Sequence, residues 1–155
     1  MGMRIKWGVG VAAGLAAVFA GVQPASAAGT GMGTGTYSFV NEATGRCLDG
    51  NSMTATRACD GGSDQKWLVT ENGGDVPVYS LKNAAHGRCL EIRAGRVLST
   101  TQCMPARDQQ WRTLSGRTTP LRDVASGHCI EDTATTLRVT ACSGGPGQRW
   151  AMQAR

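Results

Sequence analysis

The chain has 155 residues and a formal net charge of +5, with 16 Lys and Arg against 11 Asp and Glu. The basic residues are dispersed and form none of the lysine and arginine clusters of a nucleic-acid surface, so no nucleic-acid partner is expected. Six cysteines lie in the chain without any Cys-x-x-Cys spacing of a zinc or redox site, and no metal or other cofactor is expected.

The first 27 residues have the pattern of a secretory signal peptide. Arg4 and Lys6 precede an uncharged, apolar stretch over residues 7–22, and residues 25–27 read Ala-Ser-Ala, the small-x-small pattern that signal peptidase cleaves. An uncleaved membrane anchor is the alternative, but the stretch is shorter than the ~18 to 20 apolar residues that cross a bilayer. We therefore expect cleavage after Ala27 and a secreted, extracellular protein without membrane association.

A Gly- and Thr-rich linker is expected over residues 28–36, followed by three homologous repeats at about residues 37–76, 77–117 and 118–155. Each repeat contains Gly-x-Cys-[Leu/Ile]-[Asp/Glu], then a second cysteine, then Gln-x-Trp. The copies lie at residues 45–49, 59 and 65–67; at residues 87–91, 103 and 109–111; and at residues 127–131, 142 and 148–150.

The repeats predict short strands. Apolar and polar residues alternate at Tyr37 and Phe39 and again at Tyr79 and Leu81, and glycines recur about every ten residues. About four strands are expected in each repeat and about twelve in all. A unit of some forty residues with one tryptophan cannot bury its own apolar face, so the three units are expected to close around a shared axis in one all-β domain.

The six cysteines are expected to form three disulfides, because an even count in an exported chain favours oxidised pairs. Six cysteines allow fifteen connectivities. One of them respects the repeat: Cys47 with Cys59, Cys89 with Cys103, and Cys129 with Cys142.

Three Gln-x-Trp triplets with this cysteine spacing resemble the ricin-type β-trefoil lectin domain, a family of carbohydrate-binding modules, over residues 37 to about 152. As a free-standing exported module of this type, the chain looks like those secreted by soil actinomycetes. The resemblance implies a β-trefoil, with six barrel strands, three capping hairpins and one potential sugar pocket in each repeat. A carbohydrate or glycoconjugate partner is therefore expected, and the protein is expected to be a monomer.

The resemblance also assigns roles to residues. The family's sugar-hydroxyl acceptor corresponds to Asp49, Glu91 and Glu131, because a carboxylate can accept from two adjacent hydroxyls. In the family, the residue before the glutamine also contacts the sugar. This residue is Asp64 in the first repeat, Asp108 in the second and Gly147 in the third. The repeated tryptophans are expected in the core, and the glutamines are expected to satisfy backbone groups. These signature residues are Gln65, Trp67, Gln109, Trp111, Gln148 and Trp150.

The sequence departs from the family at the aromatic platform on which the sugar ring stacks. Arg57, Thr101 and Thr140 stand there, and every aromatic residue after the signal segment belongs to the repeat framework. Sugar binding is therefore expected to be weak and to rest chiefly on the first repeat, where Asp49 is joined by the flat guanidinium of Arg57. The third repeat is expected to be the poorest.

The sequence fits two other functional classes less well than carbohydrate binding. A trefoil that has lost sugar recognition can bind a protein through its loops, for example as an inhibitor, and this is the alternative. An enzyme is not expected, because His86 and His128 lie at unrelated repeat positions without a visible nucleophile or orienting partner.

Overall fold

The computed structural model describes residues 33–94, 96–113 and 118–155. The expected signal peptide and residues 28–32 of the expected linker lie outside the described residues. Every described element is a strand or a one-turn 3-10 helix, and β1 (Gly35–Asn41) begins inside the segment expected to be linker. No helix of the described residues has the length and hydropathy to cross a membrane.

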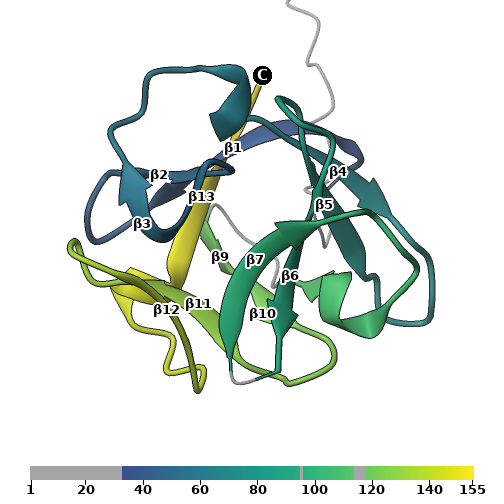
Figure 1. The fold of residues 1–155 in the computed structure, drawn as a ribbon. Helices are drawn as coiled ribbons and strands as arrows, with labels where there is room; N and C mark the ends of the chain where they lie inside the picture. The colour runs from purple at the N-terminus through teal and green to yellow at the C-terminus, as the bar shows by residue number, and fades with distance from the viewer. Residues whose placement is uncertain (1–32, 95, 114–117) are drawn as a thin grey trace, which may run out of the picture.

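A barrel of antiparallel strands forms the centre of the molecule. The pairing runs β10–β8–β5–β4–β1–β13–β9, and only Leu121 separates β9 from β10, so the circuit closes. β1 and β13 lie side by side near the two ends of the described chain (Figure 1). The remaining barrel strands are β4 (Trp67–Glu71), β5 (Tyr79–Asn83), β8 (Trp111–Arg112), β9 (Thr118–Pro120), β10 (Arg122–Asp123) and β13 (Arg149–Ala154).

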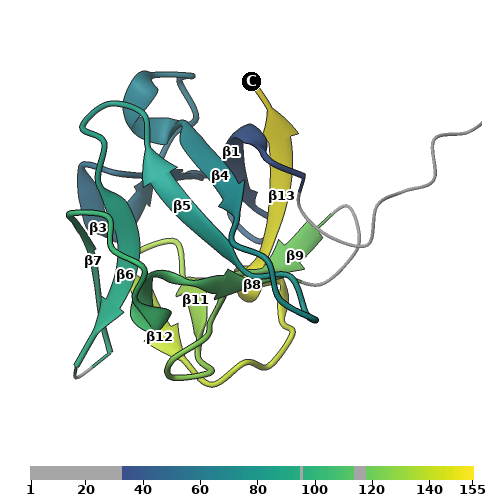
Figure 2. The same ribbon diagram turned by 90° about the vertical axis from the view of Figure 1, so that its right-hand side faces the viewer.

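One hairpin from each repeat caps the barrel. The hairpin strands β3, β7 and β12 contact one another, and Figure 2 shows them gathered away from β1, β13 and β9. This arrangement confirms the β-trefoil. The split at Leu121 gives thirteen strands in the described ranges, where about twelve were expected. The hairpins are β2 (Cys47–Asp49) with β3 (Ser52–Arg57), β6 (Cys89–Arg93) with β7 (Val97–Thr101), and β11 (Cys129–Asp132) with β12 (Leu137–Thr140).

The glycine before each first cysteine turns the chain from the barrel into the hairpin. Gly45, Gly87 and Gly127 have φ values of 66°, 67° and 70°, in the left-handed region that favours glycine. In each turn the glycine N–H donates to the carbonyl of the residue four positions earlier, at 2.9 Å. The turn therefore explains why the Gly-x-Cys motif recurs.

The three expected disulfides are confirmed: Cys47 pairs with Cys59, Cys89 with Cys103, and Cys129 with Cys142. Each closes a short loop within its own repeat. In the chain-entropy model a loop of this length contributes on the order of 3 kcal/mol, which compensates for a small core.

The three repeated tryptophans are core residues. Trp67, Trp111 and Trp150 are fully buried, and each indole N–H donates to a carbonyl of the hairpin in its own repeat. The acceptors are the carbonyls of Leu48 at 3.2 Å, Leu90 at 3.1 Å and Ile130 at 3.3 Å. A one-turn helix precedes each tryptophan: η1 (Ser63–Gln65), η2 (Arg107–Gln109) and η3 (Pro146–Gln148).

Replacement of Trp111 by alanine should lower the free energy of unfolding by roughly 3 to 5 kcal/mol, because it empties a fully buried site and removes a buried hydrogen bond. Urea unfolding measures the change. Leu68→Ala is the control, because the 42% exposed Leu68 side chain should contribute little. A stable Trp111→Ala protein with altered ligand preference would contradict the core role.

One barrel position breaks the threefold pattern. Asn41 and Asn83 donate from Nδ2 to the carbonyl of the residue before a Gln-x-Trp motif, to Gly147 at 2.8 Å and Asp64 at 2.7 Å. The third repeat has Asp123, and the corresponding carbonyl is that of Asp108. A carboxylate cannot donate, and Asp123 Oδ1 is buried without a hydrogen-bond partner in the described part of the chain.

Asp123→Asn should therefore stabilise the protein by about 0.5 to 1.5 kcal/mol at neutral pH, since the amide restores the missing donor. Its Oδ1 can still accept from Ser126 N and Oγ, which now lie 2.6 and 2.7 Å from Asp123 Oδ2. The reverse change, Asn83→Asp, is the matched control and should destabilise. Unchanged stability of Asp123→Asn in urea unfolding would contradict the missing-donor explanation.

Candidate functional site

In each repeat three residues lie around the open end of the hairpin. They are the acidic residue, the residue at the position of the family's aromatic platform, and a buried glutamine. Arg57, Thr101 and Thr140 all stand at the same register, opposite the first cysteine of the repeat. The one-turn helices carry the glutamines. Each glutamine side chain accepts from the backbone N–H of the residue after the second cysteine and donates to the carbonyl of the residue before it. Gln65 accepts from Asp60 N at 3.0 Å and donates to Ala58 O at 2.8 Å.

In the first repeat a hollow of about 300 Å³ lies over the acidic residue. Asp49 is 4% exposed, and its Oδ1 accepts from the backbone N–H of Asn51 at 2.8 Å. Among the described residues, its Oδ2 accepts only a long bond from Gln65 Nε2 at 3.4 Å. Because a carboxylate offers about four lone-pair sites, Asp49 keeps acceptor capacity. The lining residues are Asp49, Asn51, Arg57, Asp60 and Asp64.

The donors of this hollow come from Asn51 and Arg57. The Asn51 amide donates to Asp64 Oδ2 at 3.0 Å, which ties the hairpin to η1. Arg57 is exposed, and within the described residues its guanidinium makes no hydrogen bond or ion pair. The sequence indicated Asp49, Arg57 and Asp64. It missed Asn51 and Asp60, whose signals were their places two residues after the acid and directly after Cys59.

In the second repeat the acidic residue accepts hydrogen bonds from neighbouring side chains of its own repeat. The Glu91 carboxylate accepts four hydrogen bonds, which fills its acceptor capacity. Thr101, which replaces the aromatic platform, supplies one of them. The donors are Arg93 Nε at 2.6 Å, Thr101 Oγ1 at 2.7 Å, Ser99 Oγ at 3.0 Å and Gln109 Nε2 at 3.0 Å.

These bonds control the ionisation of Glu91. Burial of the carboxylate alone raises its pKa, but the hydrogen bonds from Gln109, Arg93, Thr101 and Ser99 outweigh burial and lower the pKa to about 2. Glu91 is therefore a structural anion of the β6–β7 hairpin. Asp108, the other expected residue of this pocket, has a buried Oδ1 without a hydrogen-bond partner in the described residues.

In the third repeat the acidic residue is bonded to an arginine of its own hairpin. Glu131 Oε2 accepts from Arg138 Nε at 2.9 Å across the β11–β12 hairpin. A Cβ at Gly147 would lie 2.8 Å from Asp132 O and 3.3 Å from Glu131 Cγ, so the pocket has no room for a side chain there. Position 147 therefore has room for glycine and not for a larger residue.

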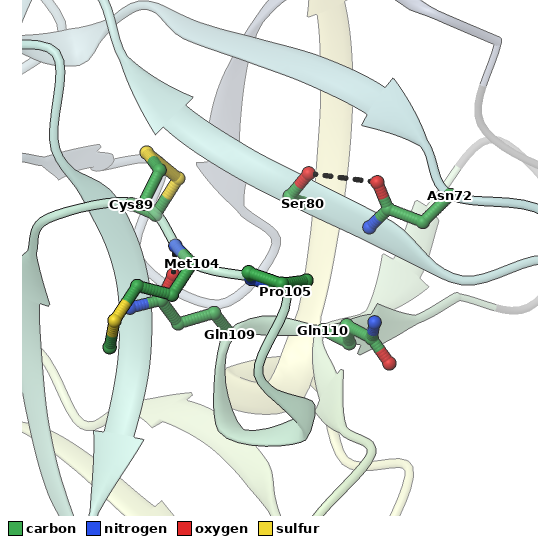
Figure 3. Close-up of a pocket in the computed structure, with 8 residues that line it drawn as sticks. Asn72, Ser80, Cys89, Met104, Pro105, Gln109 and Gln110 are labelled. Atoms are coloured by element: carbon green, nitrogen blue, oxygen red, sulfur yellow. Dashed lines mark hydrogen bonds between the residues drawn. A yellow bond between two sulfur atoms is a disulfide. The ribbon is translucent and has the colours of Figure 1, made fainter.

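Two hollows that border the second repeat are larger than the hollow of the first repeat. One, of about 610 Å³, is lined by His86, Gly87, Arg88, Arg93, Thr100, Thr101 and Gln102. The other, of about 500 Å³, lies between β5 and the loop after β7 (Figure 3). There Ser80 Oγ donates to Asn72 Oδ1 at 3.3 Å, opposite Met104, Pro105 and the Cys89–Cys103 disulfide. Neither hollow contains an acidic residue.

The hydrogen bonds to Glu91 predict how the stability of the protein depends on pH. Because its pKa is about 2 when folded and near the ordinary 4.5 when unfolded, the stabilisation is complete above about pH 4.5 and is lost as the pH falls toward 2. Glu91→Gln should therefore be less stable than wild type at pH 7, and the difference should shrink between pH 4.5 and 2. Urea unfolding at several pH values measures this, with exposed Glu71→Gln as the control. A constant difference would contradict it.

Comparison with solved structures supports the same architecture. ThreeFoil, a designed threefold symmetric protein, matches with a TM-score of 0.70 and 20% identity over 77% of this chain and 99% of its own. SeviL, solved bound to asialo-GM1 saccharide, matches with a TM-score of 0.65 and 12% identity over 79% and 98%. The exo-β-1,3-galactanase 1,3Gal43A of Clostridium thermocellum matches with a TM-score of 0.68 and 19% identity over 79% of this chain and 31% of the galactanase. At these identities the likeness shows the fold alone.

Comparison of sequences identifies the family. No curated protein matches the sequence. The family model described as ricin-type beta-trefoil lectin domain-like matches residues 25–104, about half of the chain. The matched segment contains the first repeat and most of the second, including two of the three disulfides. With three Gln-x-Trp repeats folded as a β-trefoil, the chain belongs to the ricin-type β-trefoil lectin domain-like family.

Proposed function

We propose that this chain is a secreted carbohydrate-binding module that binds sugar weakly, chiefly through its first repeat. One observation carries the proposal: Asp49 keeps free acceptor capacity beside a hollow, whereas Glu91 and Glu131 are bonded to side chains of their own repeats. The lectin-like family supports a carbohydrate ligand. Three disulfides in a small domain are consistent with an extracellular protein.

The chemistry of binding follows from the groups that line the hollow. Asp49 can accept from two neighbouring sugar hydroxyls, and Arg57 can donate to ring or hydroxyl oxygens. Arg57 also stands where the family has an aromatic ring, so binding lacks the stacking contribution. Solvent-competed hydrogen bonds of about 0.5 to 1.5 kcal/mol each then give a dissociation constant on the order of millimolar.

We further propose that the module binds without catalysing a reaction. His86 Nε2 lies 3.1 Å from Gly50 O, and His128 Nδ1 lies 3.0 Å from Ser126 O. Both imidazoles are thus engaged by backbone carbonyls. As far as the described residues extend, neither imidazole forms a hydrogen bond to a side-chain nucleophile, the bond that activates the nucleophile in covalent catalysis.

Asp49→Ala should weaken binding of a sugar ligand at least about tenfold, because the acceptor of two hydroxyls is lost. A panel of immobilised polysaccharides and glycans identifies the ligand, and calorimetric titration of the mature protein measures its affinity. Asp49→Asn, which keeps the shape of the side chain, separates loss of charge from loss of fold. Glu131→Ala is the matched comparison in the third repeat and should change binding less than about twofold.

Unchanged binding in Asp49→Ala, or an equal loss in Glu131→Ala, would reject the first repeat as the site. Failure to bind any glycan of the panel would reject carbohydrate binding and favour the alternative, a trefoil that binds a protein through its loops, for example as an inhibitor.

A further inference from the structure

We propose that the hollow between β5 and the loop after β7 is a second binding site, for an uncharged sugar ring. This inference goes beyond the proposed function, because none of the residues that line the first-repeat hollow lines this one. The acidic and platform residues of the second repeat do not line it either. The hollow measures about 500 Å³, and its lining residues are all uncharged: Asn72, Ser80, Cys89, Cys103, Met104, Pro105, Gln109 and Gln110.

The hollow is open because a short side chain stands where the first repeat is covered by a long one. Asn72 after β4 corresponds to Arg155 after β13, since their backbone N–H groups donate to the carbonyls two residues before Ser80 and Ser38, at 2.8 and 2.9 Å. Arg155 Nε donates to Ser38 Oγ at 3.0 Å, and Ser38 is 1% exposed. Ser80, beside the shorter Asn72, stays half-buried. The first repeat therefore fills with arginine the place that the second leaves open.

The loop after the second cysteine also differs in the second repeat. Pro105 stands where the other repeats have Gly61 and Gly144, whose φ values are 76° and 71°. Proline cannot adopt a positive φ, so the backbone takes another path at this residue. The preceding Met104 is 57% exposed, whereas the other repeats have a polar residue in its place. Met104 and Pro105 thus give the hollow an apolar wall that neither other repeat has.

The polar groups of the hollow are amides that lack partners. Among the described residues, Asn72 Nδ2 and the side-chain amide of Gln110 make no hydrogen bond. Figure 3 shows these two amides on one side of the hollow and Met104 on the other, with Pro105 between them. In the third repeat Arg149 takes the position of Gln110 and donates to the Gly144 carbonyl of its own loop. The second repeat therefore keeps free amides where the third has a bonded arginine.

A pyranose ring combines the two kinds of surface that this hollow offers. Its C–H face can pack on Met104 and Pro105, and its hydroxyls can bond to the amides of Asn72 and Gln110, which both donate and accept. A charged ligand would find no opposite charge among the lining residues, so the cost of its desolvation would not be offset. A wholly apolar ligand would leave the amides unpaired. An uncharged sugar ring is the ligand class that these features favour.

The test is titration of the ¹⁵N-labelled mature protein with the methyl glycosides of glucose, galactose and mannose. At least one should shift the backbone amides of residues 72, 80, 104 and 110 and the side-chain amides of Asn72 and Gln110, with a dissociation constant of millimolar order. Salt should leave this affinity nearly unchanged, because no lining group is charged. Glucitol, an open-chain polyol that has hydroxyls but no ring face, should bind at least about threefold more weakly.

Four variants locate the effect. Asn72→Arg introduces the residue type that covers Ser38, so it should fill the hollow and weaken glycoside binding at least about tenfold. Met104→Ser removes the apolar wall and should weaken binding about threefold. Thr135→Arg adds the same charge as the first variant in the exposed turn of the third hairpin and should change nothing. Asp49→Ala should also leave this site unchanged, because Asp49 does not line the hollow.

Absence of shifts at these amides with all three glycosides at about 100 mM would overturn the inference. So would glucitol binding as tightly as the best glycoside, a steep loss of affinity in salt, or unchanged binding in both Asn72→Arg and Met104→Ser. Loss of the shifts in Asp49→Ala would show that they report the first-repeat site, which also overturns the inference. The proposed function is judged separately, because its failure removes the binding that depends on Asp49 and leaves the shifts at Asn72 and Gln110 in place.

Discussion

The bond from a buried indole to a hairpin carbonyl is the constraint on which the three repeats depend. Trp67, Trp111 and Trp150 each donate to the carbonyl of the residue that directly precedes the acidic position. The buried tryptophan therefore fixes the backbone of the residue next to the acidic one. The same bond that stabilises the barrel holds each acid at the mouth of its hairpin, so the stability of the fold and the placement of the site have one origin.

The three repeats share this anchor but differ in two respects. One is the length of the acidic side chain, and the other is which residues lie opposite it on the second strand of the hairpin. The extra methylene of Glu91 and Glu131 carries their carboxylates to partners on the opposite strand, Ser99 and Thr101 in one case and Arg138 in the other. Asp49 is shorter, and its firm bond is the local one to the backbone of Asn51. Two repeats therefore use the acid to fasten their own hairpin, and one repeat leaves it facing a hollow.

Much of the fold follows from sequence because its signals are local and repeated. The glycine turns, the cysteine pairs and the tryptophan anchors each require a particular residue at a fixed position, and threefold repetition makes the pattern visible. The state of each site was less predictable. The four donors to Glu91 depend on strand register and on side-chain rotamers, which no local sequence signal specifies. The donorless Asp123 was readable as a departure from Asn41 and Asn83, but its burial was not.

If only the first repeat leaves its acidic residue open to a ligand, a sugar should perturb the hairpin of that repeat and neither of the others. Titration of the ¹⁵N-labelled mature protein with its sugar ligand, followed by amide chemical shifts, tests this directly. Among the three hairpins and the loops that follow them, shifts should concentrate at Asp49, Asn51, Arg57 and residues 60–64, and the amides around Glu91 and Glu131 should stay unchanged. Shifts centred on the second or third hairpin, or of equal size in all three hairpins, would contradict a single open acidic residue.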